Sequence, residues 1–86
     1  RIEARVNSLE RGSQVRIERL QDRISEHRER TLLEGMAPNA DFIRLIQGQM
    51  DFDRRRTSHK IENLRSKSEL SLALSLIGVV LLDVQN

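Results

Sequence analysis

The sequence predicts an all-α chain: an extended helical hairpin or coiled-coil-like bundle element that is completed by oligomerisation or by partner chains. Two observations support this fold class. Apolar residues recur at helical spacing in two stretches that a short Gly-Met-Ala-Pro-Asn segment separates. A dense apolar stretch then follows at the C-terminal end, and a chain of 86 residues offers little core with which to cover it.

Residues 1–34 are predicted to form a charged amphipathic helix. Six of their apolar side chains form one helical stripe: Ile2, Val6, Leu9, Ile17, Leu20 and Ile24. An eleven-residue frame fits this stripe better than a heptad frame, which would put Arg16 and Arg23 at core positions. Such a repeat keeps the seam straight or slightly right-handed, as in a bundle or fibre helix. Gly12 and Ser13 weaken the isolated helix, so its stability is expected to come from packing.

Residues 35–39 are predicted to form a turn. Gly35 suits a left-handed cap at the end of the first helix, and Pro38 stops that helix from continuing. Asn39 can cap a second amphipathic helix over residues 40–65, with Asp41 near the positive end of its dipole. Four apolar residues follow at helical spacing, and two more resume the stripe after the polar stretch: Phe42, Leu45, Ile46 and Met50, then Ile61 and Leu64.

The middle of the second helix is unusually polar, because Phe52 is the only apolar residue between positions 51 and 60. The helix therefore either crosses solvent in this stretch or breaks. Ser66 and Glu69 also match a capping box, which permits a separate third helix to begin there.

Residues 66–86 are predicted to be an apolar C-terminal assembly segment. Alternation of leucine with serine and alanine also fits a half-buried strand, but leucine and alanine favour a helix and no second strand-like segment is present. Burying each large apolar side chain contributes roughly 1.5 to 3 kcal/mol, so another chain is expected to cover this segment. The predicted contacts are Leu72, Leu76, Val80 and Leu81.

The length of this segment argues against a membrane span. As a helix, residues 70–84 reach about 22 Å, whereas the hydrocarbon core of a bilayer is about 30 Å thick. The segment also lacks the aromatic belt and flanking lysines of interfacial helices. Nothing in the sequence assigns a cellular compartment.

The composition offers little for catalysis or for a cofactor. The chain has no cysteine, which excludes disulfides and thiolate metal sites. Its two histidines, His27 and His59, lie in charged stretches and are interpreted as solvated. Only Glu62 lies at helical spacing from His59, and two ligands do not make a metal site. We therefore expect no enzymatic activity, no metal and no cofactor.

A basic tract suggests a second kind of partner. Arg54, Arg55, Arg56 and Lys60 form the densest positive cluster and are possible contacts for nucleic acid or another polyanion. Asp51 and Asp53 dilute this charge. The chain has no Trp or Tyr, and Phe42 and Phe52 are assigned to packing, so no platform for base stacking is expected. Nucleic-acid binding is therefore possible but not favoured.

A charged first helix, a turn carrying Pro38 and Asn39, and a long second helix with an apolar end resemble the plan of type III secretion needle and inner-rod subunits and their small hairpin chaperones. The resemblance covers the architecture only, and the basic tract at residues 54–56 departs from the needle pattern. It implies a subunit of a secretion apparatus as one alternative.

The leading hypothesis is a non-enzymatic structural or oligomerisation subunit that self-associates or docks in a larger helical assembly. Charged faces keep the free chain soluble, and the apolar surfaces select the partners. A basic helical module that binds polyanions remains the alternative from another functional class.

Overall fold

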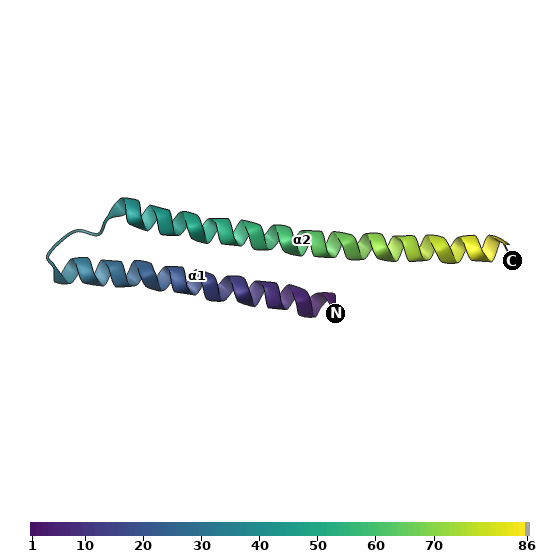
Figure 1. The fold of residues 1–86 in the computed structure, drawn as a ribbon, viewed down its shortest axis with the longest axis horizontal. Coiled ribbons are helices and arrows are strands. Elements are labelled where there is room, and N and C mark those ends of the chain that lie inside the picture. Colours follow the sequence, from purple (N-terminus) through teal and green to yellow (C-terminus); the bar gives the residue numbers. More distant parts are fainter. Residues whose placement is uncertain (86) are drawn as a thin grey trace.

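The computed structural model describes residues 1–85, which form two α-helices: α1 (Ile2–Leu33) and α2 (Ala40–Gln85). The helices lie side by side and run antiparallel, and α2 continues far beyond the first residues of α1 (Figure 1). The hairpin is 81 Å long but only 20 Å and 6 Å across in the other two directions, measured between Cα atoms. The predicted all-α hairpin is therefore confirmed, and its core is a single seam between two helices.

The first helix ends in a Schellman motif built on Gly35. This glycine has a φ of +69°, and its N–H donates to the carbonyl of Leu32 at 3.1 Å. The N–H of Met36 donates to the carbonyl of Thr31 at 2.8 Å, so two of the last helical carbonyls are satisfied. The expectation of a left-handed cap at Gly35 is confirmed.

Replacing Gly35 with alanine is expected to lower the free energy of unfolding by about 1 kcal/mol, because an L-residue resists positive φ. A Cβ at Gly35 meets no atom within 4 Å, so the cost arises in the backbone. Gly48→Ala is the matched control: its Cβ also meets open space, but Gly48 lies inside a helix, where alanine is favoured. Urea unfolding is expected to move in opposite directions for the two variants, and a shift in the same direction would contradict this account.

The second helix begins at a side-chain cap. Asn39 Oδ1 accepts hydrogen bonds from the backbone N–H groups of Asp41 at 3.0 Å and Phe42 at 3.2 Å. Asn39 itself is held against α1, because its N–H donates to His27 Nε2 at 2.9 Å. The ring of His27 also contacts that of Phe42, with centroids 4.6 Å apart. These contacts fix the turn to both helices.

The prediction that His27 is solvated is wrong. His27 is half-buried between the helices because it lies three residues beyond the buried Ile24, on the same stripe. His59 is exposed, as expected.

The helix α2 is continuous through the polar stretch and through the apolar end. A third helix starting at Ser66 and a strand over residues 70–84 are both excluded, because α2 extends from Ala40 to Gln85 without interruption. The Ser66 side chain therefore has no helix terminus to cap. Each backbone N–H in the helix interior finds its partner four residues earlier, so the end of α2 keeps this form without α1 beside it.

The core consists of the residues that face each other across the seam. Ile24, Ile46 and Met50 are buried together, and Ile17, Leu20, Phe42 and Ile43 pack against them. Leu45 and Phe52 were expected to pack but are 60% and 64% exposed. Each residue step rotates a helical position by about 100°, so these two side chains point away from α1 although their neighbours face it.

Candidate interaction surfaces

The hairpin itself uses most of the residues that the sequence predicts as contacts. Val6, Ile24, Ile46 and Met50 are buried in the seam. The half-buried members of the predicted set are Ile2, Leu9, Ile17, Leu20, Phe42, Ile61 and Leu64. Because these side chains already pack between α1 and α2, they offer little surface to another chain.

A polar layer interrupts the seam at its centre. Asp53 Oδ1 accepts a hydrogen bond from the Ser13 hydroxyl at 2.5 Å, and Asp53 Oδ2 pairs with Arg16 Nε at 2.6 Å. The Thr57 hydroxyl donates to the same carboxylate at 3.5 Å. Ser13 and Thr57 are buried, and the Asp53 side chain is only 14% exposed. The layer therefore joins two positions that lie forty residues apart in the chain.

The partners of Asp53 favour its ionised form. Arg16, and after it the hydroxyls of Ser13 and Thr57, hold the pKa of this carboxyl below its usual range, although partial burial opposes them. Gly12 leaves room for Arg16, since a Cβ on Gly12 would lie 3.2 Å from Arg16 Nη1. Among the described residues, every buried side-chain nitrogen or oxygen has a hydrogen-bond partner.

The pairing of Asp53 with Arg16 was not predicted from the sequence. The sequence indicated that the helix either crosses solvent or breaks over residues 51–60, and Asp53 was interpreted as a charge that dilutes a basic tract. One signal was present: Ser13 occupies a core position in the eleven-residue frame, between Ile2 and Ile24. A polar group buried in a core needs a partner, so the opposite helix had to supply an acceptor or donor. The frame does not show which residue of α2 supplies it.

The apolar end of α2, which we call the tail (residues 70–82), lies beyond the part of α2 that α1 covers (Figure 1). Near the start of α1, Arg65 Nη2 lies 3.9 Å from Glu3 Oε1. The tail carries nine large apolar side chains that are 55–63% exposed: Leu70, Leu72, Leu74, Leu76, Ile77, Val79, Val80, Leu81 and Leu82. No other part of residues 1–82 covers the four contacts that the sequence predicts in the tail: Leu72, Leu76, Val80 and Leu81.

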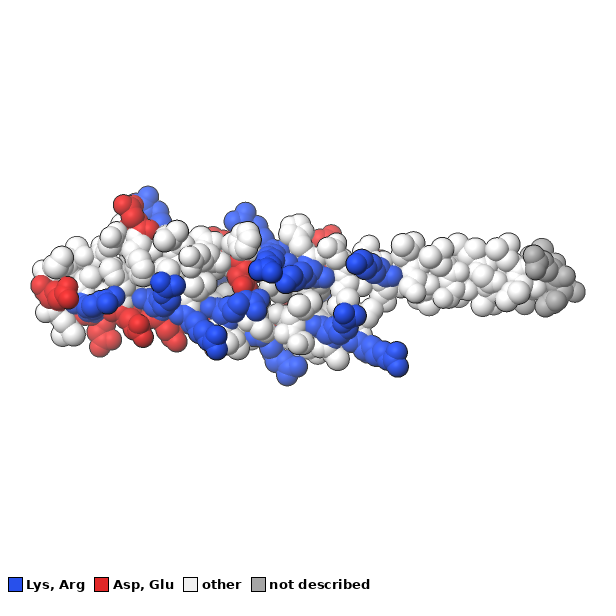
Figure 2. Space-filling view, viewed as in Figure 1, with Lys and Arg blue, Asp and Glu red and all other residues white. Residues whose placement is uncertain are grey.

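The tail is uncharged along its whole length, as its white surface shows in Figure 2. Within residues 1–85, no helix carries an apolar stretch long enough to cross a bilayer. The tail is thus an apolar surface that points away from the hairpin, without the length of a membrane span.

Charge is distributed unevenly between the two ends of the hairpin. On the tail side of the polar layer, residues 1–17 and 53–69 carry ten Lys or Arg and five Asp or Glu; we call this part the basic collar. Toward the turn, residues 18–52 carry five basic and seven acidic residues. Many of the Lys and Arg side chains visible in Figure 2 gather next to the tail. The tail therefore adjoins a part of the hairpin with a formal net charge of +5.

The predicted polyanion contacts lie in this collar but do not form one face. Arg54 pairs with Asp51 at 3.3 Å, and Arg55 Nε donates to the backbone carbonyl of Asp51 at 3.4 Å. Arg56 and Lys60 are exposed. Consecutive arginines on a helix diverge by about 100°, so the tract spreads its charge around α2.

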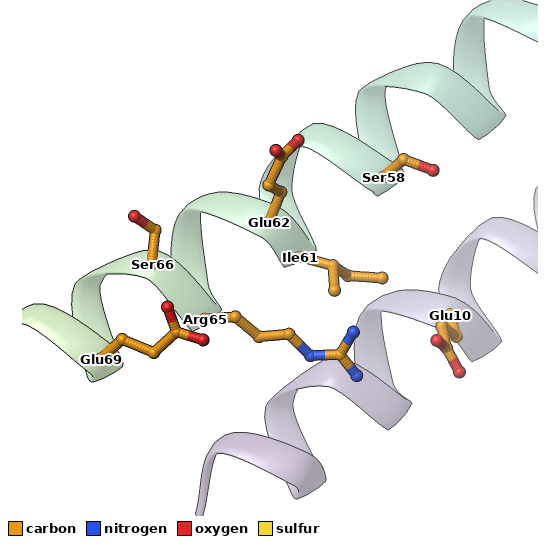
Figure 3. Close-up of a pocket in the computed structure, with 7 residues that line it drawn as sticks. All are labelled: Glu10, Ser58, Ile61, Glu62, Arg65, Ser66 and Glu69. Carbon is orange, nitrogen blue, oxygen red and sulfur yellow. The ribbon is translucent and has the colours of Figure 1, made fainter.

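A shallow groove of about 540 Å³ lies between the helices next to the tail (Figure 3). Its lining residues are Glu10, Ser58, Ile61, Glu62, Arg65, Ser66 and Glu69. Arg65 reaches from α2 toward α1, and Ile61 is the single apolar residue of the lining. Ligand pockets are usually enclosed and mostly apolar, so this groove does not have the character of a small-molecule site.

The described part of the chain also contains no group of three His, Asp or Glu side chains arranged to hold a metal ion. Comparison with protein families, with curated proteins and with solved structures finds no match to this chain. The surfaces themselves are therefore the basis for a functional proposal, and the exposed tail is the most unusual of them.

Proposed function

We propose that the chain is a non-enzymatic structural or oligomerisation element whose hairpin presents the tail of α2 to other helices. One observation carries this proposal: nine large apolar side chains remain more than half exposed although the hairpin is fully formed. Soluble monomers rarely leave contiguous apolar patches larger than a few hundred Å² uncovered.

The free energy available from covering the tail is large compared with the stability of a small domain. At roughly 1.5 to 3 kcal/mol for each of the nine side chains, the tail represents about 14 to 27 kcal/mol as an upper bound. Small domains are stable by only about 5 to 15 kcal/mol. Association through the tail is therefore strongly favoured over its exposure to water.

The hairpin has a separate part in this proposal. Its seam and polar layer hold α1 and α2 in one antiparallel register, and its charged outer faces keep this part of the chain in water. Secretion-apparatus needle, rod and small chaperone subunits, which the sequence resembles in plan, are one class of assembly that such an element would suit.

A second candidate function is the binding of nucleic acid or another polyanion by the basic collar. The observation that favours it is the concentration of positive charge next to the tail (Figure 2). Salt dependence separates the two functions. Phosphate contacts weaken steeply as salt rises, whereas hydrophobic association persists or strengthens.

Size-exclusion chromatography with light scattering on the intact chain and on a version ending at Lys67 tests the proposal. We expect the intact chain to associate at both low and high salt and the shortened chain to remain monomeric. Circular dichroism reports whether the shortened chain retains its helices.

Two double variants of the full-length chain test the same proposal without shortening the chain. Val79→Glu with Leu82→Glu charges the tail, and Leu32→Glu with Leu33→Glu makes the same change at exposed positions near the turn. Only the first pair is expected to abolish association. A monomeric intact chain would refute the proposal.

A further inference from the structure

We infer that the tail binds the tail of a second copy of this chain, and that the two tails run antiparallel. This inference rests on the proposed function, because it names the partner of the same surface. Three features of the described residues support it: the continuity of the α2 seam, the order of small and large residues along the tail, and the charge of the basic collar.

The surface that α2 turns toward α1 continues into the tail. After the adjacent pair Phe42 and Ile43, the buried or half-buried positions of α2 recur at intervals of three or four residues: Ile46, Met50, Asp53, Thr57, Ile61, Leu64 and Ser68. Positions eighteen residues apart share a face, because eighteen residues make five helical turns. The positions of the tail that correspond to Asp53, Thr57, Ile61 and Leu64 are therefore Ser71, Ser75, Val79 and Leu82. A helix that runs antiparallel to α2 on this face therefore extends the packing that α1 begins.

The four continued positions are complementary to themselves in an antiparallel pair. When Ser71 of one copy lies level with Leu82 of the other, Ser75 lies within one residue of the level of Val79. Each large leucine or valine then meets a small serine. Gly78 borders this face, and a Cβ at Gly78 finds nothing within 4 Å in the single chain, so the backbone there is open to the close approach of a helix.

Charge favours this direction over a parallel one. In a parallel pair, two collars of net charge +5 would lie side by side at the usual interhelical distance of about 8 to 10 Å, which is close to one Debye length. In the antiparallel pair, the thirteen residues of the tail separate the collars by about 20 Å.

The antiparallel register also brings opposite charges together. With Leu82 level with Ser71, the end of α2 at Gln85 lies level with Ser68 of the second copy, next to its Lys67. The negative end of each α2 dipole therefore approaches the basic collar of the other copy. This attraction is lost when the copies run parallel.

The area of the tail is adequate for such an assembly. At roughly 60 to 100 Å² for each large apolar side chain, nine of them expose on the order of 500 to 900 Å² of apolar surface. A stable protein interface buries about 800 Å² on each partner. Because Leu70, Ile77 and Val80 lie on the face opposite the seam, two antiparallel pairs that pack on each other bury more of this surface than one pair.

Cysteine cross-linking in the full-length chain tests the register directly, because the sequence contains no cysteine of its own. We would compare Ser71→Cys alone, Leu82→Cys alone and an equal mixture of the two under mild oxidation. A disulfide requires Cα atoms about 4.4 to 6.8 Å apart. Ser25→Cys, an exposed position on α1, measures random collisions.

We expect the mixture to give several-fold more disulfide dimer than either variant alone. In the proposed register, position 71 of one Ser71→Cys chain lies about eleven residues along the axis from position 71 of the other, or about 16 Å, so the two thiols do not join. Light scattering on the same samples gives the number of copies, and a dimer or a tetramer that shows the mixed cross-link supports the inference.

Three results would overturn the inference. Efficient linking of Ser71→Cys to itself means parallel tails. Association with no cross-link above the Ser25→Cys level means a different contact. In both cases the proposed function stands. A chain that stays monomeric and sediments with phosphatidylserine-containing vesicles has a lipid partner instead, and both proposals fail.

Discussion

Replacing Ile46 with alanine is expected to lower the free energy of unfolding by about 2 to 4 kcal/mol, the usual cost of a large-to-small change in a core. Ile46 is 1% exposed and belongs to the cluster with Ile24 and Met50. The hairpin has a single seam, so no second layer of structure can close the cavity left by the missing atoms.

Leu45→Ala is the matched control for this variant, because Leu45 precedes Ile46 in the same helix but is 60% exposed. Its expected effect is within about 0.5 kcal/mol of zero. Urea unfolding followed by circular dichroism measures both, at one fixed protein concentration because association shifts apparent stability. Equal losses for Ile46→Ala and Leu45→Ala would mean that the seam does not have the described helical phase.

Asp53→Asn is expected to lower the free energy of unfolding at pH 7 by on the order of 1 to 2 kcal/mol, because the ion pair with Arg16 is lost and the hydroxyls of Ser13 and Thr57 no longer donate to a charged group. The variant is also expected to remove part of the pH dependence. The pKa of Asp53 is lowered in the folded chain. The stabilisation by ionised Asp53 is therefore complete at pH values above the pKa of this carboxyl in the unfolded chain, about 3.9. It is lost as the pH falls through the lower pKa that the carboxyl has in the folded chain.

Unfolding of the wild-type chain and of Asp53→Asn between pH 7 and pH 2 tests this expectation. The two free energies are expected to differ most at neutral pH and to converge below about pH 4. Asp51→Asn is the control, since the ion pair of Asp51 with Arg54 lies at the surface and such pairs contribute about 0 to 1 kcal/mol. A difference between wild type and Asp53→Asn that is constant across this pH range would show that ionised Asp53 does not stabilise the layer.

The elements of this fold are predictable from signals that lie close together in the sequence. The stripe from Ile2 to Ile24 indicates the first helix, Gly35 and Pro38 mark its end, and Asn39 caps the second. Each signal depends on residues within one or two helical turns. Local rules therefore suffice to place α1, the turn and the start of α2, whereas they left open whether α2 continues through residues 51–60 and into the apolar end.

The contacts across the seam could not be predicted in the same way. Asp53 was interpreted as a charge that dilutes a basic tract and His27 as a solvated histidine. Asp53 instead accepts a hydrogen bond from Ser13, forty residues away, and His27 accepts one from Asn39, beyond the turn. The partner of a side chain across the seam depends on the register of the two helices. A local pattern carries no information on that register.

The amino-acid sequence alone determined that this chain forms a helical hairpin around a capped turn and ends in an apolar segment, because helical periodicity and capping are properties of neighbouring residues. The tertiary structure decided which polar groups meet in the seam and where α1 ceases to cover α2. Those outcomes depend on how α1 and α2 align along their lengths, and this alignment leaves the tail exposed to other chains.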